Sequence, residues 1–395
     1  MVKRYGAIDP ERMYETVYRL HGTRCMHDAP ERLNAAADYI HREMEKIGLP
    51  VREQTFTVPG SDFVFRNIEA RLGPAGEKPA VVLVAHYDTP ERTYGANDNA
   101  ASIALMLEVG RKMNEMSDIP PVYLVAVSLE ETNNQPAMYG EEIRSARLYG
   151  IIDDNYIYTT WDNRKMKKRA FDISQRVYNA GGDQGQGYLD AIEELKGSIS
   201  SNMKAHLLDL ARLYRGVNLS SAIGLRSRIG SNEWVMEALK EKKKISYAIA
   251  LDELGIAYDK PFTQKLTGME SGPMAERYKV DLERRVANFT GIISTTRSKS
   301  VGERFFAMCQ KEEVDMPCLH FSVPGEMDFI ISNVPQALGS DHAPFIREGI
   351  PAVMIMDTSK SRDPWVHTLG DSIDKINFSY MSRLAAAVLE TILEG

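Results

Sequence analysis

Two adjacent acidic residues end a long apolar run in this sequence, and they constrain its fold more than any other feature. The run occupies residues 121–129 and leads directly into Glu130 and Glu131. A second apolar run ends in the same way, in His86 and, two residues later, Asp88. In open α/β sheets, sites form at the carboxyl ends of parallel strands. We therefore expect two buried strands whose ends bring acids and an imidazole together at one edge of a sheet.

Apolar strands alternate with helical segments along much of the chain. The strand-like runs are continuously apolar or alternate every second residue, whereas the helical runs repeat every three to four residues. This alternation predicts an α/β fold with a mixed, largely parallel sheet that is flanked by helices on both faces. The expected strands are residues 51–58, 63–72, 81–85, 122–129, 245–251 and 352–355, and the expected helices are residues 30–48, 100–113, 232–243, 301–311 and a closing helix after Phe378.

The pattern changes after Glu131. Residues 132–229 are polar and irregular, whereas residues 1–131 and 230–395 keep the alternation of strands and helices. We interpret the two outer parts as one catalytic domain and residues 132–229 as a mainly helical insertion that acts as a lid, a cap or an oligomerisation element. Within it, the glycine-rich residues 181–187 are expected to form a flexible loop, because they follow no buried strand and match the nucleotide-binding motif poorly.

The bulk properties of the chain exclude some function classes. A net charge of −7 argues against nucleic acid as the main partner. No stretch approaches the ~18 consecutive apolar residues that a membrane helix needs, and the first residues lack the apolar core of a signal peptide. The three cysteines form no disulfide framework, which favours a reducing compartment. We therefore expect a cytoplasmic protein without a membrane partner.

Five residues at strand ends or in loops carry side chains that bind metals. Imidazole and carboxylate groups suit zinc, and also cobalt or manganese. Two histidines and three carboxylates can hold two ions if one carboxylate bridges them, and paired ions can hold a hydroxide and polarise a carbonyl group. The five residues are His86, Asp98, Glu131, Asp252 and His367.

Two further acids have expected roles beside these ligands. Asp88 can accept a hydrogen bond from the second ring nitrogen of His86, which would fix the tautomer of that ring. Glu130 is then left to take a proton from water and pass it to a leaving amine. Both residues are therefore candidates for the catalytic machinery.

Several short motifs follow one another in a fixed order along the chain. They are His86-Tyr87-Asp88-Thr89, Gly95-Ala96-Asn97-Asp98-Asn99, Glu130-Glu131, Gly230-Ser231, Leu251-Asp252-Glu253-Leu254-Gly255, Ser340-Asp341-His342-Ala343-Pro344-Phe345, Gly349-Ile350-Pro351-Ala352 and His367-Thr368. In this order they resemble the zinc-dependent aminopeptidases with two co-catalytic metal ions, metallopeptidase family 28, to which the glutaminyl cyclases are related. Each motif alone is weak, but together they form a strong signal that covers nearly all of the chain outside residues 132–229.

The resemblance implies a role for each candidate residue. The implied roles are ligands of one ion for His86 and Asp252, ligands of the other ion for His367 and Glu131, a bridge between the ions for Asp98, and general base for Glu130. The position of Asp252 has an alternative in Asp162, which lies nearer the usual distance after the acid pair and also ends a strand-like run. His342 resembles a residue that lines the site without reaching the metal.

Residues and resemblance together predict a metal-dependent aminopeptidase that acts on peptides with a free N-terminus. One alternative is a glutaminyl-cyclase-like acyltransferase with a single zinc, against which the retained Asn99 argues. A second alternative is a metal-free binding or scaffold protein, which would have lost ligand residues. We also expect a homo-oligomer, because members of this fold often assemble.

Overall fold

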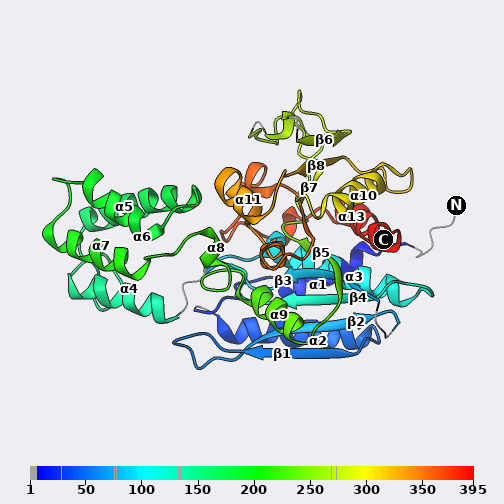
Figure 1. The fold of residues 1–395 in the computed structure, drawn as a ribbon, viewed down its shortest axis with the longest axis horizontal. Helices are drawn as coiled ribbons and strands as arrows, with labels where there is room; N and C mark the ends of the chain where they lie inside the picture. Colours follow the sequence, from blue (N-terminus) through cyan, green and yellow to red (C-terminus); the bar gives the residue numbers. More distant parts are fainter. Residues whose placement is uncertain are drawn as a thin grey trace.

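The fold is built around one mixed sheet of nine strands. The computed structural model describes residues 7–27, 29–74, 76, 78–131, 136–267, 269–272 and 274–395. Within these residues the strand order is β1-β2-β4-β3-β5-β9-β7-β8-β6 (Figure 1). The four central strands, β4, β3, β5 and β9, run parallel. The predicted α/β class, with a mixed sheet between helices, is confirmed.

Antiparallel pairs flank this parallel centre on both sides. β2 pairs with β4 and carries β1 on its outer edge, and β7 pairs with β9 on the other side. The strands are β1 (Val51–Phe56), β2 (Phe65–Leu72), β3 (Ala80–His86), β4 (Val122–Val127), β5 (Ile245–Leu251), β6 (Ala275–Tyr278), β7 (Thr290–Ser294), β8 (Cys318–Ser322) and β9 (Ala352–Met356).

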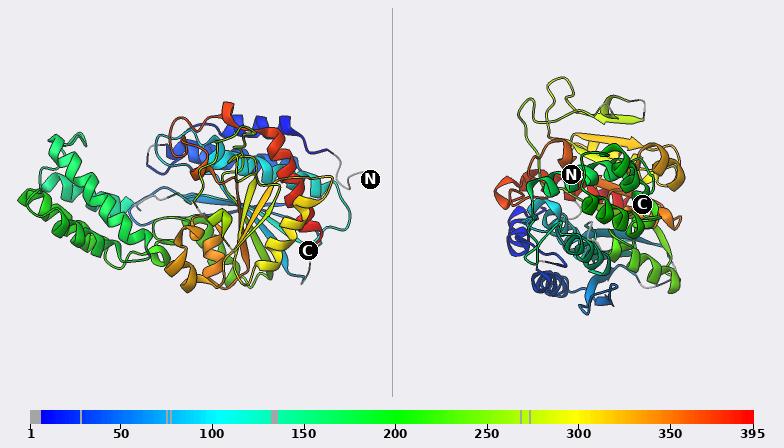
Figure 2. Two further views of the ribbon diagram at one scale, coloured as in Figure 1. Left: turned by 90° about the horizontal axis from the view of Figure 1, so that it is seen from above. Right: turned by 90° about the vertical axis from the view of Figure 1, so that its left-hand side faces the viewer.

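Alternating strand positions separate the core into two layers. On β3, Leu83 and Ala85 face one layer, whereas Val82 and Val84 face the other. Because helices cover both faces, the central strands are apolar along their whole length (Figure 2). The first layer contains α1 (Pro10–Leu20), α2 (Pro30–Lys46), α3 (Ser102–Asn114), α10 (Lys299–Gln310) and α13 (Phe378–Leu393), and the second contains α9 (Ile229–Lys240), α11 (Met327–Asn333) and α12 (His342–Arg347).

Between β4 and α9 the chain forms a helical lobe, residues 136–222, that projects from the sheet (Figures 1 and 2). The lobe has a core of its own, which includes Tyr188, Leu207 and Tyr214. Its position within residues 132–229 fits the expected helical insertion, whose boundaries stay a prediction. The helices of the lobe are α4 (Pro136–Leu148), α5 (Trp161–Asn179), α6 (Gln184–Glu194), α7 (Ser201–Leu213) and α8 (Leu219–Ala222).

The chain returns from the lobe to the place from which it left. The backbone N–H of Arg228 donates to the carbonyl oxygen of Glu130 at 2.7 Å, and that of Gly230 donates to the carbonyl oxygen of Ser128 at 3.0 Å. The returning segment therefore runs along the end of β4, directly beside the acid pair. Helix α9 begins at this point, so the same contact that ends the lobe also positions α9 on the sheet.

The predicted loop at residues 181–187 is only partly correct, because α6 includes the last four of these residues. Gly185 and Gly187 lie where α6 packs against its neighbours. A side chain at Gly185 would overlap the carbonyl oxygen of Ala211 in α7, and one at Gly187 would lie 2.7 Å from the Cα of Ser174 in α5. These glycines therefore permit close helix packing and do not indicate a loop.

Most predicted strands and helices lie within a few residues of their expected bounds. The prediction of a strand-like run before Asp162 is wrong: Tyr158 forms only an isolated β-bridge with Ile152, and α5 begins at Trp161. The sequence pattern does not predict α1 or the strands β6 to β8. These three strands are only four or five residues long. None of the helices in the described ranges is both long and apolar enough to cross a membrane.

A buried polar cluster lies inside the lobe. The Lys167 amine pairs with the carboxylate of Glu142 at 2.6 Å, and the Ser145 hydroxyl lies 2.9 Å from Nδ1 of His206. His206 is fully buried. Its burial and the charge of Lys167 lower the pKa of His206 to about 4 from an ordinary value of 6.5. The unfolded chain therefore binds this proton more tightly than the folded lobe does.

We predict that the lobe loses stability as the pH falls from 6.5 toward 4, because His206 must take up a proton that its surroundings reject. Since one pKa unit corresponds to about 1.4 kcal/mol, the loss from this residue is roughly 3 kcal/mol. Amide hydrogen exchange of α4 and α7 measures it. In the His206→Asn variant the exchange rates of the same amides should depend less on pH. An unchanged dependence would contradict the role of His206.

Candidate metal centre

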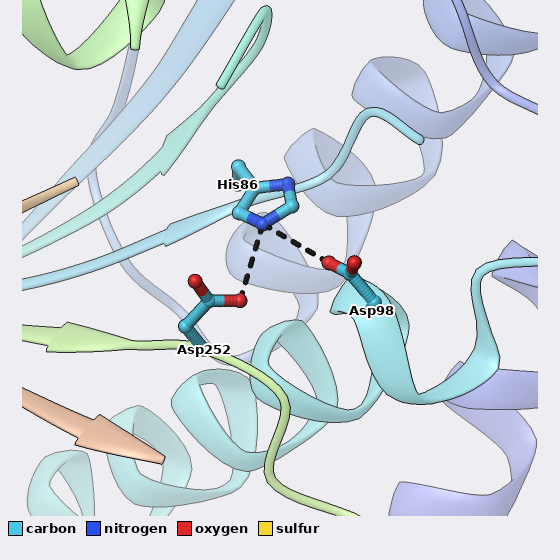
Figure 3. Close-up of side chains that lie close together, drawn as sticks. All are labelled: His86, Asp98 and Asp252. Carbon is cyan, nitrogen blue, oxygen red and sulfur yellow. Dashed lines mark hydrogen bonds and ion pairs between the residues drawn. The ribbon is translucent and has the colours of Figure 1, made fainter. Parts of the chain in front are cut away.

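The carboxyl ends of β3 and β5 bring the first three predicted ligands together. His86 is the last residue of β3, and Asp252 directly follows β5, its parallel neighbour. Nε2 of His86 lies 3.4 Å from Oδ1 of Asp252 and 3.4 Å from Oδ1 of Asp98 (Figure 3). One ring nitrogen therefore faces two carboxylates that come from different loops.

Asp98 also faces the second histidine. Its Oδ2 atom lies 3.0 Å from Nε2 of His367, which in turn lies 3.5 Å from Oε1 of Glu131. The two oxygens of Asp98 thus point toward two different imidazoles, His86 on one side and His367 on the other. His86 and Asp98 are buried, whereas the His367 side chain is 44% exposed.

Asp88 ties the ends of β3 and β4 together. Its two carboxylate oxygens accept the backbone N–H groups of Glu130 and Glu131 at 3.0 and 3.2 Å. Its Oδ1 lies 3.4 Å from Nδ1 of His86, but without the geometry of a hydrogen bond. The contact with the imidazole is therefore looser than the sequence predicts, and Asp88 mainly fixes the turn that carries the acid pair.

Side chains from distant parts of the chain hold the loop that carries Asp98. Asp371 accepts the backbone N–H groups of Asn97 and Asp98 at 2.7 and 3.1 Å. The Asn99 side chain donates to the carbonyl oxygen of Leu251 at 3.0 Å, which links the loop to the end of β5. Asp98 is not the N-cap of the next helix, because α3 begins only at Ser102. These contacts fix the carboxylate of Asp98 between its neighbours.

His86 and the central Asp98 stabilise each other's charged forms. Burial disfavours a charged His86 ring, but the surrounding carboxylates, first of all Asp252, raise the pKa of His86 well above its usual value. Burial would also raise the pKa of Asp98, but the two imidazoles outweigh it and hold that pKa well below its usual range. The centre is thus a set of charges that depend on one another.

The two glutamates are the least compensated charges of the centre. Burial raises the pKa of Glu130 and of Glu131 well above the usual range, and neighbouring acids add to the effect, Asp341 at Glu130 and Asp98 at Glu131. Carboxylates that crowd together in this way favour a cation between them, because it restores their ionised form.

The donor set fits divalent metal ions. Within the described parts of the chain, three groups of residues place one ligand atom each within 4.8 Å of one another. All donors are imidazole nitrogens or carboxylate oxygens, the types that zinc, cobalt and manganese accept. The groups are His86 with Asp98 and Asp252, Asp98 with Glu131 and His367, and His86 with Glu130 and Glu131.

The seven site residues predicted from the sequence all lie at this centre, but the alternative to Asp252, Asp162, does not. Asp162 is exposed on α5 in the lobe, so Asp252 is the aspartate beside His86. His342 is buried, and its Nε2 donates to the carbonyl oxygen of Ala337 at 2.6 Å. It belongs to none of the three donor groups.

An apolar cavity of about 700 Å³ opens beside the centre. Arg228, Asp252, Glu253 and Lys360 line its charged end, and the apolar wall includes Ile293 of β7, Phe321 of β8 and Met354 of β9. The lobe contributes Tyr178, Asn179 and Leu219 to the border of the cavity. Its volume lies in the range of ~300–1,000 Å³ that is typical of ligand sites.

Several residues at this centre were not predicted from the sequence. Asp371 lies only four residues after His367, so its proximity in the sequence was a usable signal. Arg228 lies two residues before the Gly230-Ser231 motif, but nothing in its local pattern indicates a position beside Glu130. Lys360 gives no signal in the sequence.

Comparison with known proteins identifies the family of this chain. Residues 67–201 and 226–392 match the peptidase family M28. The chain belongs to this family. The match extends into the lobe and leaves out only residues 202–225 between its two parts.

One relative is similar in sequence, and several solved structures share the fold. The chain is 33% identical over 149 residues to the uncharacterized protein YfbL of Escherichia coli (strain K12), a match that covers 35% of this chain and 44% of that protein. A leucine aminopeptidase precursor and a glutaminyl cyclase, both from Bacteroides thetaiotaomicron, have TM-scores of 0.58 and 0.57. They are 14% and 15% identical, with 99% of each chain covered.

The family places the protein among metallopeptidase-type hydrolases, and the predicted resemblance is confirmed. A zinc-dependent exopeptidase from Parabacteroides distasonis shares the fold as well, with a TM-score of 0.55, 13% identity and coverage of 99% of this chain and 100% of that one. Because these structures include both peptidases and glutaminyl cyclases, the fold leaves the choice between the two reactions to the residues of the centre.

We predict that Gly230→Ala destabilises the protein by about 1–3 kcal/mol, because the site has no room for a side chain. The added Cβ would overlap the carbonyl oxygen of Ser128 and lie 2.7 Å from Oδ1 of Asn67. Urea unfolding measures the loss. Gly140→Ala in α4 is the matched control, since in the described part of the chain no heavy atom beyond its neighbours and its own helix backbone lies within 4 Å of its Cβ position. Equal effects of the two changes would contradict the packing account.

Proposed function

We propose that this protein is an aminopeptidase that uses two divalent metal ions, with zinc as the expected ion. The observation that carries the proposal is the position of Asp98, whose two oxygens face His86 and His367 separately. A carboxylate placed in this way suits a bridge between two ions. Membership in peptidase family M28 supports the proposal.

The donors divide into two sets that share Asp98. His86 and Asp252 would hold one ion, and His367 and Glu131 the other. When bound, the ions would polarise the scissile carbonyl group and lower the pKa of the attacking water. Cobalt or manganese would suit the same nitrogen and oxygen donors.

Glu130 carries the proton in this proposal. Its carboxylate takes a proton from the attacking water and passes it to the nitrogen of the leaving group. Burial raises the pKa of Glu130, which favours the protonated form that the second transfer requires. Asp88 positions Glu130 by accepting its backbone N–H.

The free α-amine of the substrate would bind near the acids at the end of the cavity. Asp252 and Glu253 line that end, and both are buried. An amine held there places the first peptide bond at the metal centre, which restricts cleavage to the N-terminal residue. Peptides as substrates, a homo-oligomer and a cytoplasmic location stay predictions.

Two other readings receive less support from the residues of the centre. An acyltransferase of the glutaminyl-cyclase kind would need one zinc, whereas His367, Asp98 and Glu131 form a second donor group. A metal-free scaffold protein would gain nothing from burying so many carboxylates, since each buried charge costs free energy unless it is compensated. Both alternatives are tested by the number of ions bound.

We predict about two zinc ions per chain in the native protein, measured by mass spectrometry of metals after dialysis. His367→Ala should reduce the number to about one, because it removes a donor from one set only. Asp98→Asn should reduce it below one, because both sets share that carboxylate. Asp162→Asn, which changes an exposed acid of the lobe, is the control and should keep both ions. One ion in the native protein would favour the acyltransferase.

Glu130→Gln should lower kcat by about 10²- to 10⁴-fold without loss of metal, because it removes the group that moves the proton but keeps its shape. The measurement is hydrolysis of an aminoacyl anilide, with the metal content of the variant determined in parallel. The N-acetylated anilide should not be cleaved by the native protein. Full turnover by Glu130→Gln with both ions bound would overturn the mechanism.

A further inference from the structure

Arg228 lies beside the proposed general base and, among the described residues, forms only one long ion pair. Its Nη1 atom is 4.0 Å from Oε1 of Glu130, at the limit of an ion pair. Its side chain is only 9% exposed. Among the described residues, Nε has no hydrogen-bond partner, and the guanidinium makes no other ion pair. A buried guanidinium in this state is costly, because its charge is desolvated without full compensation.

The backbone of Arg228 is held in an unusual conformation. Its φ angle of 53° lies in the left-handed region, which residues with a side chain rarely adopt. The hydrogen bond from its N–H to the carbonyl oxygen of Glu130 fixes it there. A strained residue at a site, held by its surroundings, points to a role for its side chain. That side chain lines the apolar cavity beside the centre.

Lys360 is a second cation on the lining of the same cavity. The carboxylate of Glu253 raises the pKa of the Lys360 amine above its usual value, and Asp252 acts in the same direction. Arg228 is the cation that lies beside Glu130, at 4.0 Å, and its planar guanidinium can donate two parallel hydrogen bonds to a carboxylate.

The chemistry of the reaction says which carboxylate would reach Arg228. Glu130 passes its proton to the nitrogen of the leaving residue, so that nitrogen must come within hydrogen-bond distance of Glu130. In a dipeptide, the α-carboxylate is separated from that nitrogen by a single carbon atom, the Cα of the leaving residue. The guanidinium that lies 4.0 Å from Glu130 is therefore within reach of this carboxylate.

We propose that Arg228 binds the free α-carboxylate of the leaving residue and that the preferred substrates are dipeptides. This inference rests on the proposed aminopeptidase function and specifies its substrate class. The free amine of the dipeptide would bind near Asp252 and Glu253, its carboxylate would bind Arg228, and the apolar wall would accept the side chains. Tyr178, Asn179 and Leu219 of the lobe line the same cavity, so the lobe contributes to the space in which the substrate would lie.

The test compares three substrates on the metal-loaded protein: Leu-Gly, Leu-Gly amide and Leu-Gly-Gly. The native protein should cleave Leu-Gly with a kcat/KM at least tenfold above that of the amide. Arg228→Asn should lose tenfold to hundredfold on Leu-Gly, mainly through KM, because a charge-assisted hydrogen bond is removed, and should change little on the amide. Asparagine tolerates the left-handed backbone, which protects the fold. Arg228→Lys should keep part of the preference for Leu-Gly.

Each other result overturns a defined part of the inference. Equal hydrolysis of Leu-Gly and its amide by the native protein would overturn it without any variant and would leave the aminopeptidase intact. Equal losses on both substrates in Arg228→Asn would mean that Arg228 acts through Glu130. If Lys360→Met lost the preference for Leu-Gly and Arg228→Asn kept it, the carboxylate would bind Lys360 and not Arg228. Hydrolysis of none of the three substrates would overturn the proposed function and this inference together.

Discussion

Repulsion among buried carboxylates is the constraint on which the metal centre depends. Asp98, Glu130, Glu131 and Asp252 are each less than a tenth exposed. Such a cluster separates unless the backbone holds it and opposite charge compensates it. The parallel strands supply the first condition, because β3, β4 and β5 end side by side. The two imidazoles supply part of the second, and a divalent cation would supply the rest.

The gathering of the site residues was predictable because its signals are local. A continuously apolar strand shows where it ends, and a polar side chain at that end must lie at the edge of the sheet. His86, the acid pair and Asp252 all follow such strands, and parallel neighbours place their ends together. The roles of these residues as ligands and base are a separate matter and stay predictions.

The remaining features depend on contacts that join distant parts of the chain. Asp371 binds the loop of Asp98 across 273 residues; its closeness to His367 in the sequence indicates the site, but no short pattern pairs it with that loop. Helix α6 packs against its neighbours at Gly185 and Gly187, so the start of this helix has the composition of a loop. Arg228 lies beside Glu130 because the returning end of the lobe bonds to the end of β4. Local propensity contains no trace of these long-range contacts.

The lobe enters and leaves the sheet at the same place, and this has a consequence for how the protein can evolve. The free-energy cost of closing a loop grows only slowly with its length. Helices can therefore be gained, lost or exchanged in the lobe without moving β4 or α9. Because the lobe borders the cavity while the sheet carries the donors, selection for new substrates can act on one module while the other keeps its chemistry. The returning segment at Arg228 belongs to both modules.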